Sequence, residues 1–379
     1  MFMTSMNNYL LKKRLDWVDQ IKGLAILGIV LFHFFQNYPK INFLISFLDD
    51  TGAKIGFASV DIFFLLSGFN FGYKLNTWKI QADRQKHRYQ NTFTWLKQRI
   101  IRIYPTYWLA ILFSLLIFFI SSYPIKLVNN FDFILIFLGF PGYDRFKLIN
   151  PGLWFVSVIV QTYLIMPLLL KIAVNRPRNI LLIGIIIGVL NKTLCWGFGF
   201  TSNFKAGFYY FFLQNNFIGS YFLPICLGIY WGYIYNKYQN FRRQDWQVSI
   251  IFFSLGLIIQ LISTMNNFYL PYKSGLDLFY ISFFLLFLYY VFTQLLGCQF
   301  WLLKIIQLIG FNSYQVYLIH QPLFFILIAW LTKNNYSEFF ISLPINLIIT
   351  GISLSIYVYI FTQTDVYLRK VIGHIYSSN

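Results

Sequence analysis

Residues 14–35, RLDWVDQIKGLAILGIVLFHFF, decide the fold of this chain. Their apolar run is long enough for a helix that crosses the ~30 Å hydrocarbon layer of a bilayer. Lys22 and His33 are eleven residues apart, so on a helix they share nearly the same face and are separated by about 16 Å along the axis. If the helix enters the membrane from its Lys-rich end, Lys22 lies at the headgroup level and His33 near the middle of the bilayer.

His33 is a candidate functional residue because of this depth. An ionisable side chain in the middle of a bilayer is costly unless it faces a polar cavity, and such residues are functional candidates by default. The alternative is a packing role, since membrane helices also use histidine for hydrogen bonds between helices.

The composition is typical of a polytopic membrane protein. Of the 379 residues, 58% are hydrophobic and only 11% are charged, whereas a soluble domain has about 25% charged residues. The net charge of +18 does not indicate nucleic-acid binding, because the basic residues lie between hydrophobic spans. The three cysteines are far apart and match no metal or disulfide spacing. We therefore expect no nucleic-acid partner and no metal.

The apolar runs predict an all-α polytopic membrane protein with about ten transmembrane helices and a single membrane-embedded domain over residues 1–379. A shorter run, 131–140, is expected to be re-entrant or interfacial, and the short tails are about 1–16 and 362–379. The predicted spans are 17–36, 55–75, 100–121, 152–171, 180–196, 217–236, 248–266, 277–296, 311–332 and 339–361.

The distribution of Lys and Arg predicts the orientation. Ten crossings place both termini on one side, and the segments on that side carry roughly twice as many Lys and Arg residues as the opposite segments. The positive-inside rule therefore places both termini in the cytoplasm.

Other spans carry polar residues at a depth close to that of His33. These are Asp61, Gln161 and His320. One hypothesis is a shared polar cavity. The alternatives are that Asp61 pairs with a cation at a helix end, that Gln161 forms a hydrogen bond between helices, and that His320 is a satisfied core histidine.

A second group of candidates is basic. Arg99 and Arg102 are spaced i, i+3 at the predicted cytoplasmic end of the third span, so they project to one side of the helix. Together with Lys22 they are suited to bind a phosphorylated ligand. The alternative is that they serve topology alone.

Five motifs, in order along nearly the whole chain, resemble the integral-membrane acyltransferase 3 family, whose bacterial members O-acylate surface polysaccharides, lipopolysaccharide and lipid-linked sugars. Four positions differ from patterns in the family. Lys22 replaces the usual Arg, Gly152 replaces a His of some members, and Ile159 and Val160 replace acidic residues of others; these differences concern the substrate subgroup. The matching residues are Lys22 and His33; Asp61, Phe63, Phe64, Ser67, Gly68 and Phe69; Arg99, Arg102, Ile103, Pro105, Tyr107 and Trp108; Leu153, Trp154, Phe155, Ser157, Tyr163 and Pro167; and Ser313, Tyr314, Tyr317, Leu318, His320 and Pro322.

The resemblance implies transfer of an acyl group, with acetyl as the expected group, from acyl-CoA to a hydroxyl of a carbohydrate or glycolipid. It also implies a bacterial cytoplasmic (inner) membrane as the location. Acyl-CoA would be a co-substrate, with no bound cofactor; the partners would be the acceptor and membrane lipid, and a homo-oligomer is left open. His33 would act as general base or acyl relay. The predicted site residues are His33, Asp61 and His320 for catalysis; Lys22, Arg99 and Arg102 for the donor; and Ser67, Trp154, Gln161 and Tyr317 for the acceptor or for support.

Two other classes compete with this interpretation. A transporter or flippase for a glycan or lipid intermediate would use the polar residues at mid-membrane as a substrate path. A structural membrane subunit would leave the aligned polar residues unexplained.

Overall fold

The protein is helical throughout the part of the chain that the structure describes. The computed structural model describes residues 15–40, 43–75, 88–124, 130–140, 146, 148–199, 212–265, 276–295, 301–333 and 339–377. Within these ranges there are α-helices and short 3₁₀ and π segments but no strand. The predicted all-α class is confirmed.

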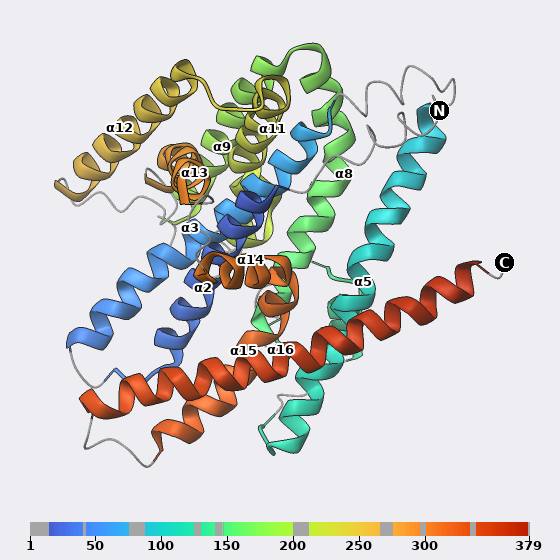
Figure 1. Cartoon of the computed structure of the whole chain (residues 1–379), viewed down its shortest axis with the longest axis vertical. Coiled ribbons are helices and arrows are strands. Elements are labelled where there is room, and N and C mark those ends of the chain that lie inside the picture. Colours follow the sequence, from blue (N-terminus) through green and yellow to red (C-terminus); the bar gives the residue numbers. More distant parts are fainter. Residues whose placement is uncertain are drawn as a thin grey trace.

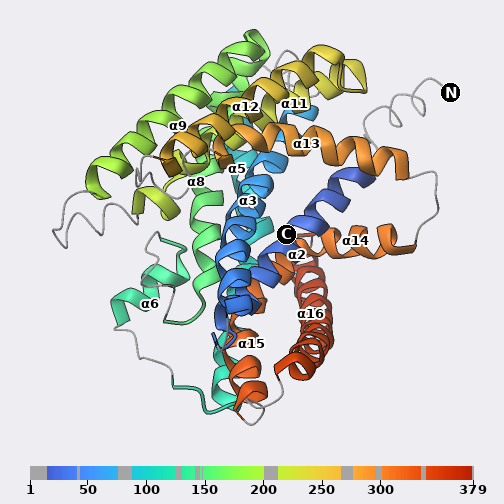
Figure 2. The same ribbon diagram turned by 90° about the vertical axis from the view of Figure 1, so that its left-hand side faces the viewer.

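Each predicted span corresponds to a helix in the structure (Figures 1 and 2). Among the described residues, six helices contain a stretch that is long and apolar enough to cross a membrane. The chain is therefore a polytopic membrane protein. The helices that match the predicted spans are α2 (Asp16–Asn37), α3 (Phe43–Tyr73), α5 (Arg88–Ile120), α8 (Trp154–Asn175), α9 (Pro177–Gly199), α11 (Phe222–Tyr238), α12 (Arg243–Met265), α13 (Leu276–Leu295), α15 (Ser313–Thr332) and α16 (Phe339–Ser377).

The helix bounds differ from the apolar runs at several places. Helices α3 and α5 begin twelve residues before the predicted spans at 55 and 100, and α16 continues past 361 to Ser377 as one helix. Helix α14 (Trp301–Phe311) was not predicted, because its eleven residues are too few to span a membrane. The short run at 131–140 forms helix α6 (Asn130–Phe137), and two one-turn segments, η1 (Pro151–Leu153) and η3 (Ile218–Tyr221), precede α8 and α11.

Helices α3 and α11 make the most extensive contact in the molecule, and glycines make it possible. Each helix carries two glycines four residues apart, Gly68 and Gly72 on α3 and Gly228 and Gly232 on α11. A Cβ atom on Gly228 would collide with the carbonyl oxygen of Leu65 in α3. Small residues at this spacing allow two membrane helices to approach backbone to backbone. This pair forms a rigid support for α2, which packs against α3.

Helix α2 is held among several neighbours. Besides α3, it contacts α13, α14 and α15. The crossing with α14 is again close, since a Cβ atom on Gly310 would collide with the carbonyl oxygen of Asp19. Figure 2 shows α14 beside the first part of α2 and α15 beside its far end. The neighbours therefore fix both the Lys22 end and the His33 end of this helix.

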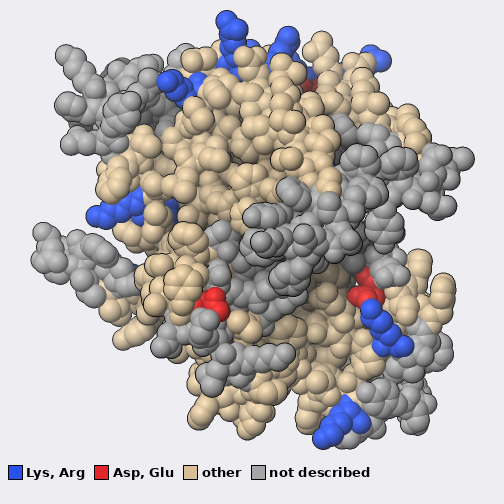
Figure 3. Space-filling view, turned by 180° about the vertical axis from the view of Figure 1, so that it is seen from behind, with Lys and Arg blue, Asp and Glu red and all other residues tan. Residues whose placement is uncertain are grey.

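The charged side chains are unevenly distributed over the surface. Figure 3 shows a face that is mostly uncharged, with Lys and Arg gathered mainly towards its upper edge. The described part of the surface exposes many large apolar side chains, such as Phe119, Leu168 and Ile348. In a soluble protein such a surface would be unfavourable, but lipid covers it in a membrane.

Candidate active site

Two histidines from distant parts of the chain lie side by side. His33 lies in the second half of α2 and His320 in the middle of α15, and their ring centroids are 5.1 Å apart. The two residues meet because α15 packs against α2. The sequence predicted a similar depth for both, and the structure adds that they are neighbours.

Two amide side chains hold the ring of His33. The Nδ1 atom is 2.8 Å from Oε1 of Gln36, which lies one helical turn further along α2. Because an amide oxygen only accepts, Nδ1 donates its proton and Nε2 keeps a lone pair. The Nε2 atom of Gln321 is 3.0 Å from each ring nitrogen. The two ring nitrogens point in different directions in the ring plane, so an amide equidistant from both rests against the ring and fixes its plane.

His320 is oriented by the backbone of its own helix. Its Nδ1 donates to the carbonyl oxygen of Tyr317 at 2.8 Å, so its Nε2 is an acceptor. The side chain is fully buried. Among the described residues, neither Nε2 of His320 nor Oε1 of Gln321 has a hydrogen-bond partner. Buried acceptors are normally paired, so both atoms match a ligand that brings a hydrogen-bond donor, such as a hydroxyl group.

A cavity of about 660 Å³ opens among α2, α3, α5, α8 and α15. Among the described residues that line it are five cationic side chains and one carboxylate. The excess of positive charge suits a ligand with several negative charges, such as a group of phosphates. These charged lining residues are Lys22, Lys74, Arg99, Arg102, Arg369 and Asp19.

Lys22 and Arg99, two of the cations predicted to bind the donor, are held by different contacts. The Nζ atom of Lys22 is 3.4 Å from Oδ1 of Asp19, one turn earlier on α2. The guanidinium of Arg99 lies over two aromatic rings, 5.3 Å from the centroid of Phe71 and 5.4 Å from that of Trp95. Cation–π contacts of this kind orient a guanidinium without neutralising its charge. Arg99 is therefore set in place and still able to bind an anion.

Arg369 brings the last helix to the same cavity. Its Nε donates to Oδ1 of Asp365 at 3.1 Å, and its Nη2 donates to the carbonyl oxygen of Arg102 at 2.8 Å. Asp365 is almost fully buried and also accepts from Thr106 Oγ1 at 2.6 Å. This network ties α16 to α5 next to the predicted donor residues.

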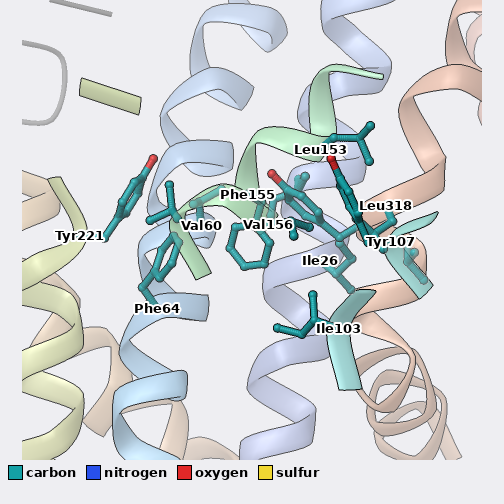
Figure 4. Packing of buried hydrophobic residues seen from close by; sticks show 14 of the residues in the cluster. Ile26, Val60, Phe64, Ile103, Tyr107, Leu153, Phe155, Val156, Tyr221 and Leu318 are labelled. Carbon is teal, nitrogen blue, oxygen red and sulfur yellow. The ribbon is translucent and has the colours of Figure 1, made fainter. Parts of the chain in front are cut away.

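The cavity and the histidine pair are separate. Phe155 of α8 and Tyr317 of α15 line the inner end of the cavity, whereas neither histidine is among its described lining residues. Along α2, the residues between the two regions are packed, with Ile26 and Ile29 at most 1% exposed. Figure 4 shows Phe155 inside this layer, with Phe64 to one side and Ile26 to the other. An aromatic and aliphatic layer therefore lies between the cations and the imidazoles.

The other predicted site residues lie in three different places. Ser67 lines the cationic cavity together with Tyr317. Asp61 is buried on α3, with 3% of its surface exposed, and is not among the described lining residues. The ring of Trp154 stacks on that of Tyr221, with centroids 5.8 Å apart.

Gln161 ties α8 to the segment before α11. Its Nε2 donates to the carbonyl oxygen of Asn216 at 2.8 Å, and its Oε1 accepts from the backbone N–H of Ile218 at 3.1 Å. Both ends of the amide are thus used on backbone groups. The structure places Gln161 as a tie between these segments.

Sequence analysis missed four residues of this region. Gln36 and Gln321 contact His33, and Lys74 and Arg369 line the cavity. Gln36 was accessible to prediction, since position i+3 lies on the face of His33. Arg369 contributed only to the bias of Lys and Arg that predicts the orientation, because nothing local in the sequence links the end of α16 to α5.

The described residues contain no group of three or more His, Cys, Asp or Glu side chains that could hold a metal ion. Cys195 and Cys226 are buried. Cys298 lies outside the described residues.

Comparison with known proteins gives one family and one curated relative. A family model described as an acyltransferase domain matches residues 15–362. The peptidoglycan O-acetyltransferase OatA of Listeria monocytogenes is 26% identical in an alignment of 200 residues that covers 49% of this chain and 29% of that protein. The match thus spans less than a third of the length of this relative. No solved structure matches the chain.

Proposed function

The chain belongs to the acyltransferase 3 family. On that premise we propose that it transfers an acyl group from acyl-CoA to a hydroxyl of a carbohydrate or glycolipid, and that acetyl is the preferred acyl group. The enzyme class follows from the family. The donor, the acceptor and the roles of individual residues are our proposal.

The charge of the cavity carries this proposal. Five cations and one carboxylate line it, and acyl-CoA offers several phosphate charges on a ligand whose thioester lies at the end of a long, thin arm. Planar guanidinium groups bind phosphate oxygens in pairs, and three of the five cations are arginines. Arg99 and Arg102 lie at the predicted cytoplasmic end of α5, where a cytoplasmic donor would enter. We place the protein in a bacterial cytoplasmic membrane with both termini inside.

The histidine pair supports the chemical step. In the general-base route, the acceptor hydroxyl attacks the thioester carbon, Nε2 of His33 takes the hydroxyl proton, the C–S bond breaks, and the CoA thiolate leaves and regains a proton. In the relay route, Nε2 of His33 attacks first and CoA leaves, and the acceptor hydroxyl then attacks the acyl-imidazole. Both routes need the Nε2 lone pair, and the hydrogen bond from Nδ1 to Gln36 provides it.

The polar atoms around His33 support a hydroxyl acceptor. The acceptor atoms Nε2 of His320 and Oε1 of Gln321 match the donor of a hydroxyl group. The name of the Listeria relative describes O-acetyl transfer to peptidoglycan, which supports acetyl as the acyl group and a glycan as the acceptor.

The test is release of CoA from acetyl-CoA by the purified protein in detergent, with a mixed glycan extract as acceptor. We expect release by the wild type and loss of at least a hundredfold in His33→Asn, which keeps a polar side chain of similar size. Gly351→Ala on α16 is the control, because an added Cβ atom there meets nothing within 4 Å. Elution as a single species on size exclusion shows that each variant is folded. Folded His33→Asn protein with wild-type activity would refute the role of His33, and wild-type protein that neither binds nor turns over acetyl-CoA would refute the donor.

A further inference from the structure

Two aromatic rings close the inner end of the cationic cavity. Phe155 and Tyr317 belong to the cavity lining, and their ring centroids are 4.6 Å apart at an interplanar angle of 44°. Both side chains are nearly buried, at 7% and 4% exposure. The ring of Tyr317 is also 5.9 Å from that of His320. The ring pair is thus the boundary between the cavity and the imidazoles.

Little space remains around this boundary. Phe155 packs against Phe64 of α3, with centroids 5.1 Å apart, and Phe64 is 1% exposed. On α2, Ile26 and Ile29 belong to the same packed cluster. Figure 4 shows Phe155 with Phe64 on one side and Ile26 on the other. A ligand atom that enters this layer must displace a side chain, which is unfavourable in a closely packed core.

The two residues of the ring pair differ in their link to His320. The carbonyl oxygen of Tyr317 accepts from Nδ1 of His320, so a shift of this part of α15 would disturb the histidine. The side chain of Phe155 is wholly apolar, and packing alone holds it. Phe155 is therefore the ring that yields when an acyl group reaches His33.

From these contacts we propose that the ring pair of Phe155 and Tyr317 is the acyl-length filter of the enzyme, with Phe155 as the residue that restricts the donor to the acetyl group. This inference rests on the proposed use of acyl-CoA. The thioester of the donor must pass from the cationic cavity to His33, and this boundary lies between them. An acetyl group adds one methyl beyond the carbonyl, whereas each further methylene must displace more of the packed layer. Discrimination of about tenfold or more per methylene is typical of a closed apolar pocket.

The experiment measures CoA release from acetyl-, propionyl- and butyryl-CoA by the wild type, Phe155→Leu and Phe155→Ala. The readout is the ratio of kcat/KM for butyryl-CoA to that for acetyl-CoA, which is independent of the amount of active protein. We expect the wild type to prefer acetyl-CoA and Phe155→Ala to raise the ratio by at least tenfold, with Phe155→Leu in between. Ile159→Ala is the matched control. Ile159 lies one turn along α8 and lines the same cavity, and its variant should keep the wild-type ratio.

The outcomes separate this inference from the function on which it rests. Wild-type protein that uses butyryl-CoA as well as acetyl-CoA overturns the filter without any variant, so the test holds even if Phe155→Ala does not fold. An unchanged ratio in folded Phe155→Leu and Phe155→Ala also overturns it, as does an equal rise in Ile159→Ala. Wild-type protein that uses none of the three thioesters refutes the acyl-CoA donor instead.

Discussion

The side chains around His33 act on different properties of its imidazole. Gln36 accepts from Nδ1 and so selects the tautomer, while Gln321 lies against the ring and limits its rotation. In a general base or nucleophile the tautomer decides which nitrogen reacts. Gln36 should therefore affect turnover more than donor binding, because the cationic cavity is at the other end of α2.

We expect Gln36→Leu to lower kcat by about tenfold to a hundredfold, since a lost hydrogen bond to the reacting imidazole is worth roughly 1–3 kcal/mol. The KM for acetyl-CoA should stay close to that of the wild type. Gln36→Glu keeps an acceptor for Nδ1 and should retain most of the activity. Steady-state kinetics of the three proteins check this. A rise in KM without a fall in kcat, or equal losses in both variants, would contradict a positioning role.

The residues of the site differ in how far the sequence could predict them. The eleven-residue interval placed Lys22 and His33 on one face of a helix, and i, i+3 spacing placed Arg99 and Arg102 together. Depth along a helix, however, carries no lateral information. His320 and Gln161 had similar predicted depths, yet His320 lies beside His33 whereas Gln161 binds the backbone before α11. Only the packing of α15 on α2 distinguishes them.

At the scale of helices, apolar run length predicted the α-helices that match the ten spans but not how they cross. The crossing of α3 and α11 depends on glycines that have no signal in hydropathy, and α14 was too short to be seen as a span. Both features matter for the site. The crossing of α3 and α11 supports α2 through α3. Helix α14 meets α2 at Asp19, which pairs with Lys22.

The helix crossing gives a test of stability. In Gly228→Ala the new Cβ atom would collide with the carbonyl oxygen of Leu65 in α3. Backbone on both sides leaves no flexible group to move, so we expect the free energy of unfolding to fall by about 1–3 kcal/mol or more. Gly351→Ala on α16 is the control, because a Cβ there meets nothing within 4 Å, and alanine is the better helix former. Thermal unfolding in detergent should show a lower Tm for Gly228→Ala alone; equal Tm values in both variants would show that the crossing tolerates a side chain.

Over the whole molecule, the cations and the imidazoles lie at different levels along α2. Lys22 lies at the cavity end and His33 at the other, with a packed apolar layer between them. Helix α16, far from α2 in sequence, contributes Arg369 to the cavity end, and α15 contributes His320 to the imidazole end. This division predicts that binding of the charged part of the donor and the chemical step respond to different conditions.

A change of ionic strength should separate donor binding from the chemical step. Raising salt from 0.1 M to 1 M shortens the Debye length from about 10 Å to about 3 Å, which weakens attraction between the cavity cations and the donor phosphates. We expect the KM for acetyl-CoA to rise severalfold and kcat to change little, since a packed apolar layer lies between the cations and the histidine pair. Acetyl-pantetheine, which has the thioester arm but no phosphate, is the matched donor. It should react with a low kcat/KM that salt hardly alters, because none of its binding comes from the cations. The same salt response for both donors would mean that salt acts on the protein as a whole, and the cationic cavity would then have no part in binding the donor.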